Sequence, residues 1–121
     1  MQYEWLSDYC LQKPGVIKDY KDEWEAFRYL IGDKMFVMVG EDNTGKPIIT
    51  LKLEPLRGEI VRQQYTGSVT PGYYMNKVHW NSVYFEGTVP DDELKSMLDE
   101  SYLIVLNSLP KRLQAEIQAQ A

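Results

Sequence analysis

The stretch Ala26-Phe-Arg-Tyr-Leu-Ile31, Gly32-Asp33, Lys34-Met-Phe-Val-Met-Val39 decides the fold. β-Branched and aromatic side chains dominate both runs, as is typical of β-strands. The Gly32-Asp33 pair between them suits a two-residue turn, because glycine adopts positive φ without strain. We therefore expect a tight antiparallel hairpin within a sheet.

Further strands are expected on the C-terminal side of this hairpin. Residues 48–53 form another apolar run after the polar loop 41–47, so three strands run in a meander. Residues 80–86 alternate, with Val83 on one face and Ser82 on the other, as in a half-buried strand. A short strand is also expected within 68–75.

Helices are expected where apolar residues recur at helical spacing. A first helix covers 2–12, where Tyr3, Leu6 and Cys10 share one face, a second covers about 55–65, and Pro90 opens a long third helix. Residues 111–121 form a helical tail after Pro110. The prediction is an α+β, two-layer fold of order α-β-β-β-α-β-β-α, with helices on one face of an antiparallel sheet.

The other face of that sheet carries a mixture of side chains. Two explanations stay open, a solvated surface or a binding face. The residues concerned are Arg28, Leu30, Thr50, Lys52, Ser82 and Tyr84.

Length and charge narrow the class of protein. The length of 121 residues suits a single domain that spans residues 1–121 and has one hydrophobic core. The net charge is −5 and the pI is near 4.8, so the protein as a whole repels polyanions. Nucleic-acid binders, in contrast, attract phosphates with Lys and Arg. The single cysteine, Cys10, favours a reducing compartment, and no run approaches the ~20 apolar residues of a membrane span. We expect a cytoplasmic protein without membrane contact.

Candidate catalytic groups lack the context that chemistry needs. The loop from Gly40 to Lys46 fits a phosphate-binding pattern, but Pro47 replaces the magnesium-binding hydroxyl and no helix follows. Cys10 and His79 are single residues with no orienting partner, and zinc requires clusters of such ligands. The acidic runs 91–93 and 99–100 suit a helix N-terminus and a solvated helix face. We expect no enzyme activity, no metal site and no cofactor.

The most informative stretch is Pro71-Gly-Tyr-Tyr-Met-Asn-Lys-Val-His-Trp80, which concentrates aromatic and hydrogen-bonding side chains before a strand. Such a mixture is typical of an interface. The structural alternative is that Pro71-Gly72 makes a turn, Trp80 anchors the core and Asn76 caps a bend.

This stretch also resembles the most characteristic motif of the MmcQ/YjbR family of small bacterial proteins. Cys10-Leu-Gln-Lys-Pro-Gly-Val16 is similar to the family's first helix exit, and Gly32-Asp-Lys-Met-Phe36 to its hairpin. Asp99-Glu-Ser-Tyr102 and Leu109-Pro-Lys111 resemble its C-terminal helix and exit. The matches cover about residues 6–113 in order.

The resemblance implies a fold similar to that of type III secretion chaperones, and a DNA-binding role through paired β-hairpin wings. The family often has a basic residue before His79, where this chain has Val78, so one phosphate contact is missing. In this hypothesis Lys77 meets phosphate, Tyr73 or Tyr74 packs on sugar, and Trp80 positions the strand.

The sequence therefore predicts a non-enzymatic binding domain with DNA as the first partner to test. The alternative is a protein-interaction or homodimerisation module, because tyrosine and tryptophan are favoured at such interfaces. A third option is a small-molecule or enzymatic pocket near Tyr73–Trp80. The residues expected to bind DNA or another partner are Tyr73, Tyr74, Asn76, Lys77, His79 and Trp80, assisted by Lys111 and Arg112.

Overall fold

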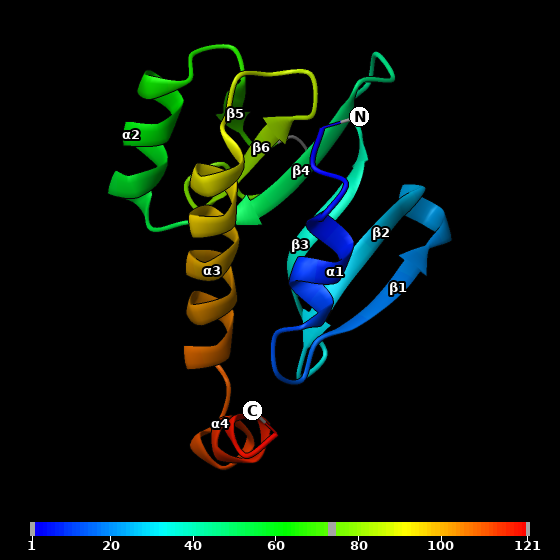
Figure 1. Cartoon of the computed structure of the whole chain (residues 1–121), viewed down its shortest axis with the longest axis vertical. Coiled ribbons are helices and arrows are strands. Elements are labelled where there is room, and N and C mark those ends of the chain that lie inside the picture. The colour runs from blue at the N-terminus through cyan, green and yellow to red at the C-terminus, as the bar shows by residue number, and fades with distance from the viewer. Residues whose placement is uncertain (1, 73–74, 121) are drawn as a thin grey trace.

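A computed structural model describes residues 2–72 and 75–120, and its centre is a six-stranded antiparallel sheet of order β1-β2-β3-β4-β6-β5 (Figure 1). The expected α+β class is confirmed. The strands are β1 (Ile17–Lys21), β2 (Ala26–Ile31), β3 (Lys34–Glu41), β4 (Pro47–Lys52), β5 (Val69–Pro71) and β6 (Trp80–Tyr84). Strand β1 is an addition to the expected order, and it pairs along its whole length with β2.

The β2–β3 hairpin has the two-residue turn that the sequence indicated. Ile31 pairs with Lys34, and both Gly32 and Asp33 have positive φ, 53° and 65°. Two successive positive φ values are what a type I′ turn requires, and such a turn matches the twist of the flanking strands. A side chain at Gly32 would also meet Leu113 and Leu109, its Cβ lying 2.9 and 3.0 Å from their methyl carbons. The turn is therefore fixed both locally and by the C-terminal helices.

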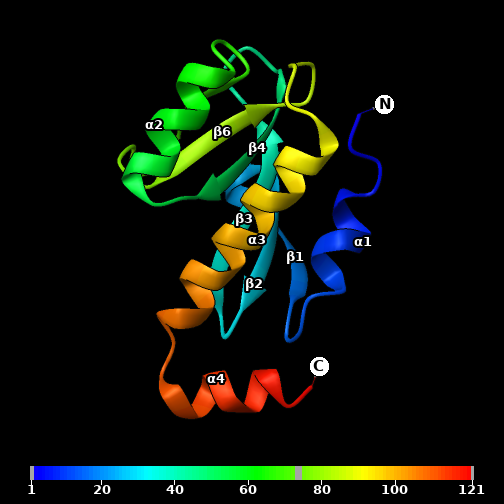
Figure 2. The same cartoon turned by 60° about the vertical axis from the view of Figure 1, so that its left-hand side comes forward.

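The helices lie on one face of the sheet, as expected (Figure 2). The first begins later than predicted, because Tyr3 has a φ of 63° and interrupts the helix before Leu6. Tyr3, Leu6 and Cys10 are nevertheless all buried in the main core. None of the described helices is long and apolar enough to cross a membrane. The helices are α1 (Leu6–Leu11), α2 (Pro55–Gln64), α3 (Asp91–Asn107) and α4 (Lys111–Gln118).

Helix α3 closes the core over β3 and β4. Its fully buried Leu94, Met97 and Leu98 face the sheet. Ser101 adds a polar tie, because its hydroxyl donates to the Phe36 carbonyl (2.6 Å) and accepts from the Lys52 amide (2.9 Å). The helix is thus held by apolar burial and by one side chain that bonds to two neighbouring strands.

Helix α2 buries only part of its apolar sequence. Val61 and Gly58 are buried, whereas Leu56 and Ile60 are exposed. A Cβ at Gly58 would lie 3.1 Å from the Asn81 side-chain oxygen, to which Arg62 donates a hydrogen bond. The helix therefore approaches β6 through its glycine, and this close approach turns Leu56 outward.

The back face of the sheet, opposite the helices, is neither fully solvated nor fully open. The strand register places Arg28, Thr50 and Ser82 across it, as expected, and adds Met38 between Arg28 and Thr50. Thr50 and Ser82 are only 0% and 1% exposed, and their hydroxyl oxygens lie 3.0 Å apart in a hydrogen bond. Of the two explanations left open, a solvated surface does not apply at the centre of this face. Chain from both ends of the sheet lies over it, as described below.

Candidate functional site

The segment that joins β5 to β6 is organised by Asn76. Its side-chain oxygen accepts a hydrogen bond from the Val78 amide (2.8 Å), and its carbonyl accepts one from the Trp80 amide (2.9 Å). Asn76 therefore shapes the bend that leads into β6, which is the structural role considered for it. Its own side chain is exposed, as are those of Lys77 and Val78.

Gly72 and Trp80 close the base of this segment. The Gly72 amide donates to the Trp80 carbonyl (2.6 Å), and a Cβ at Gly72 would lie 2.7 Å from the Trp80 Cβ. Only glycine fits this close approach without a shift. Lys77 Nζ donates to the Gly72 carbonyl (3.1 Å), and Lys52 Nζ lies 5.9 Å from the centre of the Trp80 ring.

His79 contributes through its backbone. Its carbonyl accepts from the Leu53 amide (2.8 Å) and from the Asn81 side-chain amide (3.2 Å). These bonds carry the β4–β6 pairing beyond the end of the strands. The imidazole is half-buried. Tyr73 and Tyr74, the other two residues expected in this motif, lie outside the described residues.

Lys111 and Arg112 do not join this segment. They begin α4, which lies at the opposite end of the molecule from β5 and β6 (Figure 1). Arg112 is exposed and pairs with Glu116 one turn later (3.5 Å). The structure therefore separates these two basic residues from Asn76, Lys77, His79 and Trp80.

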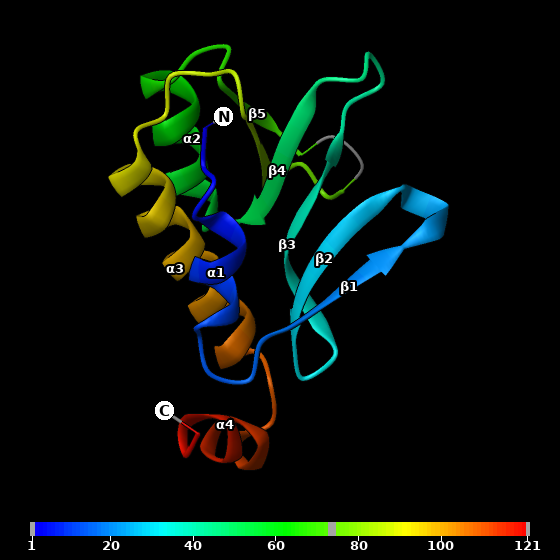
Figure 3. The ribbon, with the colours of Figure 1, turned by 45° about the vertical axis from the view of Figure 1, so that its right-hand side comes forward.

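A second feature faces the 75–80 segment across the back face, the hairpin tip between β1 and β2, residues 21–25. Its centre is a 3-10 turn, Asp22–Trp24, which ends at Glu25 with a φ of 51°. Lys21 Nζ pairs with Glu23 (3.2 Å) and lies 5.3 Å from the centre of the Trp24 ring. The β1–β2 hairpin projects from the sheet (Figure 3), and these contacts hold the Trp24 indole at its tip.

Arg28 supports the indole from beneath. Its guanidinium carbon lies 5.7 Å from the centre of the Trp24 ring, and its nitrogens donate to both oxygens of Asp19 (2.9 and 2.5 Å). The Arg28 hydrogen bonds lower the pKa of Asp19 and raise that of Arg28. Both side chains therefore stay charged, and the positive charge of Arg28 is balanced by the carboxylate of Asp19.

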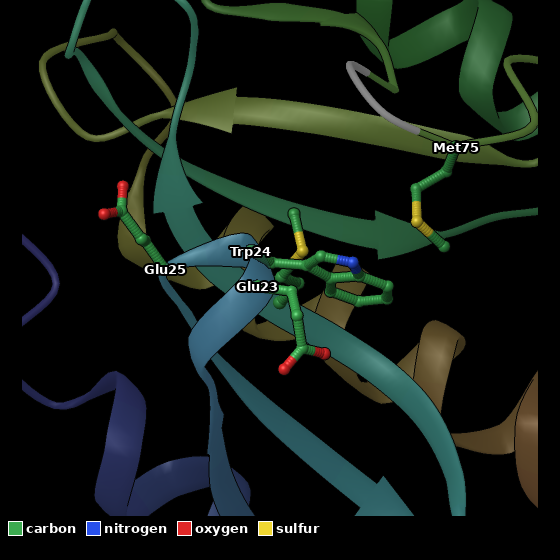
Figure 4. Close-up of a pocket in the computed structure, with 5 residues that line it drawn as sticks. Glu23, Trp24, Glu25 and Met75 are labelled. Carbon is green, nitrogen blue, oxygen red and sulfur yellow. The ribbon is translucent and has the colours of Figure 1, made fainter.

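Between the hairpin tip and the 75–80 segment lies a cavity of about 420 Å³ lined by Glu23, Trp24, Glu25, Met38 and Met75. The Trp24 indole and the Met75 thioether extend toward one another from its two sides, while the Glu25 carboxylate points away (Figure 4). Met38, on β3, belongs to the floor and is 2% exposed. The described lining thus combines an indole and two thioethers with acidic groups, and it includes no Lys or Arg.

Sequence reasoning reached one side of this cavity and missed the other. Met75 lies within the motif that the sequence singled out, whereas Trp24 and Met38 were not considered. The available signal was Trp24 itself, because a tryptophan among the charged residues 21–25 has no local apolar partner. An exposed aromatic in such a setting points to recognition rather than to the core.

The loop that fitted a phosphate-binding pattern is occupied by its own side chain. The Asp42 carboxylate accepts bonds from the Thr44 hydroxyl (2.7 Å), the Lys46 amide (3.0 Å) and the Tyr84 hydroxyl (2.8 Å). Led by the Thr44 hydroxyl, these donors hold the pKa of Asp42 well below its usual range. These donors of the loop are therefore already bonded to its own carboxylate.

The other chemical candidates are built into the framework. Burial raises the pKa of the Cys10 thiol to about 12, so it is neutral at physiological pH. Glu93 and Glu100 both pair with Arg57, and Asp99 pairs with Lys13. Within residues 2–72 and 75–120, no three His, Cys, Asp or Glu side chains are grouped to hold a metal ion.

Comparison with known proteins gives a consistent result. A family model described as YjbR matches residues 11–104. The uncharacterized protein YjbR of Escherichia coli K12 is 36% identical over 106 residues, which cover 88% of each chain. The uncharacterized protein YyaQ of Bacillus subtilis is 32% identical, over 75% of this chain and 86% of its own.

Two solved structures are similar in fold. The crystal structure of Deinococcus radiodurans protein DR2400, a DUF419 domain, has a TM-score of 0.82 and 31% identity, covering 93% of this chain and 85% of its own. A crystal structure from Pseudomonas syringae has a TM-score of 0.75 at 20% identity, covering 87% and 99%. At that identity the second structure supports the fold alone.

Proposed function

The chain belongs to the YjbR family, and from that premise we propose that it is a non-enzymatic binding domain that holds an apolar side chain of a protein partner. The relatives' names state no activity, so the proposal rests on the site. The observation that carries it is the cavity of about 420 Å³ between Trp24 and Met75. This volume is at the lower end of ligand-binding pockets, roughly 300–1,000 Å³.

The lining chemistry supports a protein partner. Methionine side chains adapt their shape and make favourable contacts with aromatic rings, and they are common at surfaces that accept varied partners. Tryptophan is among the residues that contribute most to binding at protein interfaces. Met38 and Met75 with Trp24 therefore form a small apolar recess, and Glu23 at its rim suits a partner that carries positive charge nearby.

The same geometry supports duplex DNA less well. A DNA-binding surface gains affinity from several Lys or Arg side chains that reach phosphates. Here the described cavity lining is acidic, Arg28 and Arg57 pair with carboxylates, and Lys111 lies at the far end of the molecule.

DNA stays as a second candidate because of one feature. Lys77 and Asn76 are both exposed on the 75–80 segment, where the family resemblance placed the DNA contact. One phosphate contact at Lys77 is compatible with this arrangement. The single, unpaired Cys10 suits a reducing compartment, and we propose that either partner is met in the cytoplasm.

A two-armed experiment tests these proposals. We expect the full-length protein to enrich peptides with an apolar or aromatic anchor from a random-peptide phage library. Trp24→Ala should lose these peptides, and Leu56→Ala, which removes an exposed apolar side chain on α2, should retain them. Enrichment that is unchanged in Trp24→Ala would contradict the proposed cavity.

The DNA arm uses fluorescence anisotropy with a labelled duplex at two salt concentrations. Salt-sensitive binding that disappears in Lys77→Ala would favour DNA over a protein partner. A metabolite panel in a thermal-shift assay covers the small-molecule option, and a shift lost in Trp24→Ala would move the proposal to that class.

A further inference from the structure

The two edges of the sheet differ in their ability to accept another strand. Edge strand β5 has only three residues and ends at Pro71, which has no amide hydrogen to donate. Edge strand β1 has five residues, Ile17–Lys21, none of them proline, and it is paired with β2 only. Strand β1 is therefore the edge on which another chain can add.

The lysines of β1 do not shield this edge. Lysine side chains commonly protect edge strands from pairing. Here Lys18 Nζ turns back to the Ser7 hydroxyl (3.1 Å) and lies 4.7 Å from the centre of the Phe27 ring. Lys21 Nζ turns to Glu23. Neither ammonium group extends past the edge in the single chain, and because both contacts are exposed to solvent, carboxylates of a second copy can replace them.

The side chains that remain at this edge are apolar. Ile17 and Tyr20 are 57% and 49% exposed. Tyr20 and Phe27 lie opposite one another in the β1–β2 ladder and stack edge to face, with ring centres 5.0 Å apart. Such a pair offers a strand partner aromatic area on one face of the sheet.

The sequence of this edge is complementary to itself. Residues 18–22 read Lys-Asp-Tyr-Lys-Asp. If two copies pair antiparallel about Tyr20, Asp19 lies opposite Lys21 of the second copy and Tyr20 lies opposite Tyr20. Lys18 lies opposite Asp22, the first residue of the 3-10 turn that follows β1. Opposite charges across a strand pair are stabilising and like charges are destabilising. This register therefore sets two charge pairs within the β1 ladder, where Asp19 also keeps its bonds to Arg28, and two more at the ends of the ladder, around an aromatic centre.

Neighbouring registers lose this match. Residues that lie opposite one another in an antiparallel pair point to the same face of the sheet. A two-fold axis perpendicular to the sheet also keeps each side chain on its own face, so the axis must pass between one residue and its own copy. An axis at Asp19 sets Asp19 against its own copy, and axes at Lys18 or Lys21 do the same with a lysine. Charge complementarity thus selects both the partner and the register.

We propose that β1 is a self-association edge, on which a second copy of this chain adds its own β1 antiparallel about Tyr20. The sheet then continues across both copies, and the Tyr20–Phe27 pairs of the two copies meet at the axis. This inference does not depend on the cavity, since Trp24 and Met75 are not needed for the pairing.

A charge-swap experiment with the full-length protein tests the proposal by sedimentation equilibrium. We expect a concentration-dependent dimer, and Lys18→Glu or Asp22→Lys alone should weaken it about tenfold, because each sets two pairs of like charges in opposition. Mixing the two variants should restore wild-type association as a heterodimer. Lys46→Glu, with the same charge change on an exposed loop, should leave the dimer unchanged.

The opposing results are equally clear. A wild-type protein that stays monomeric up to roughly 1 mM would overturn the proposal. A dimer that resists both single variants would also overturn it, as would a mixture that fails to restore association while both variants keep their circular-dichroism spectra. Trp24→Ala should dimerise normally, so the failure of this proposal and that of the cavity are distinguishable.

Discussion

The two faces of the sheet are closed by different means. The helix-covered face is sealed by large apolar side chains from α1, α3 and the central strands, many of them fully buried. The back face is closed at its centre by the Thr50–Ser82 hydroxyl pair, and beside it lies the cavity between Trp24 and Met75. The difference indicates that stability resides mainly on the helix side, which leaves the back face free for recognition.

The largest effect is expected from opening the helix side. Leu98 on α3 is 0% exposed, whereas Leu103 on the same helix is 52% exposed. Leu98→Ala should lower the free energy of unfolding by about 2–5 kcal/mol, because the buried cavity it leaves cannot refill. Leu103→Ala should change it by less than about 0.5 kcal/mol. Equal effects in urea unfolding would show that α3 does not seal this face.

A smaller effect is expected at the centre of the back face. Thr50→Val keeps the shape of the side chain but removes its hydroxyl from the buried bond to Ser82. We expect a loss of about 1 kcal/mol in the free energy of unfolding. Combining it with Ser82→Ala should cost less than the sum of the two single changes, because they share one hydrogen bond. Additive losses in urea unfolding would contradict the pairing.

Trp24→Ala should separate stability from recognition. The indole is 45% exposed and lies near the charged groups of Lys21 and Arg28, so we expect a loss below about 1 kcal/mol despite the size of the side chain. Thermal unfolding measures this loss. A collapse of the fold comparable to that of Leu98→Ala would mean that the hairpin tip is part of the structural core.

The smallest effect depends on pH and concerns Asp42, which ties the β3–β4 loop to Tyr84 on the back face. Because its folded pKa is lowered, its contribution to stability is present above the ordinary Asp pKa and is lost as pH falls toward the folded value. Asp42→Asn should be less stable than wild type at about pH 7, and the gap should narrow at about pH 3. A gap in urea midpoints that does not change with pH would contradict this role.

The central elements could be predicted from the sequence because their patterns are strong. The β2–β3 hairpin and α3 combine apolar periodicity with turn and proline signals, and both formed where expected. Strand β1 was missed because three of its five residues are charged, as an edge strand without a buried face permits. Helix α2 formed about where it was expected, but its packing could not be predicted, because its contact with Asn81 depends on Gly58 and not on an apolar side chain.

The site could be predicted only in part. Asn76, Lys77, His79 and Trp80 form one connection, so their proximity follows from the sequence alone. Trp24 and Met75 are far apart in the chain, and they meet only because the hairpin tip and the 75–80 segment lie over the same face of the sheet. No local pattern encodes such a meeting, and the sheet order was needed to reveal it.

The contacts of helix α4 also bear on the order in which the chain folds during synthesis. Leu113 and Ile117 follow every strand and α3 in the chain, and they cover Gly32 in the β2–β3 turn and Gly15 after α1. Until α4 emerges from the ribosome, that end of the core stays uncovered. A ribosome stalled before Leu113 would therefore display an apolar surface to chaperones and proteases.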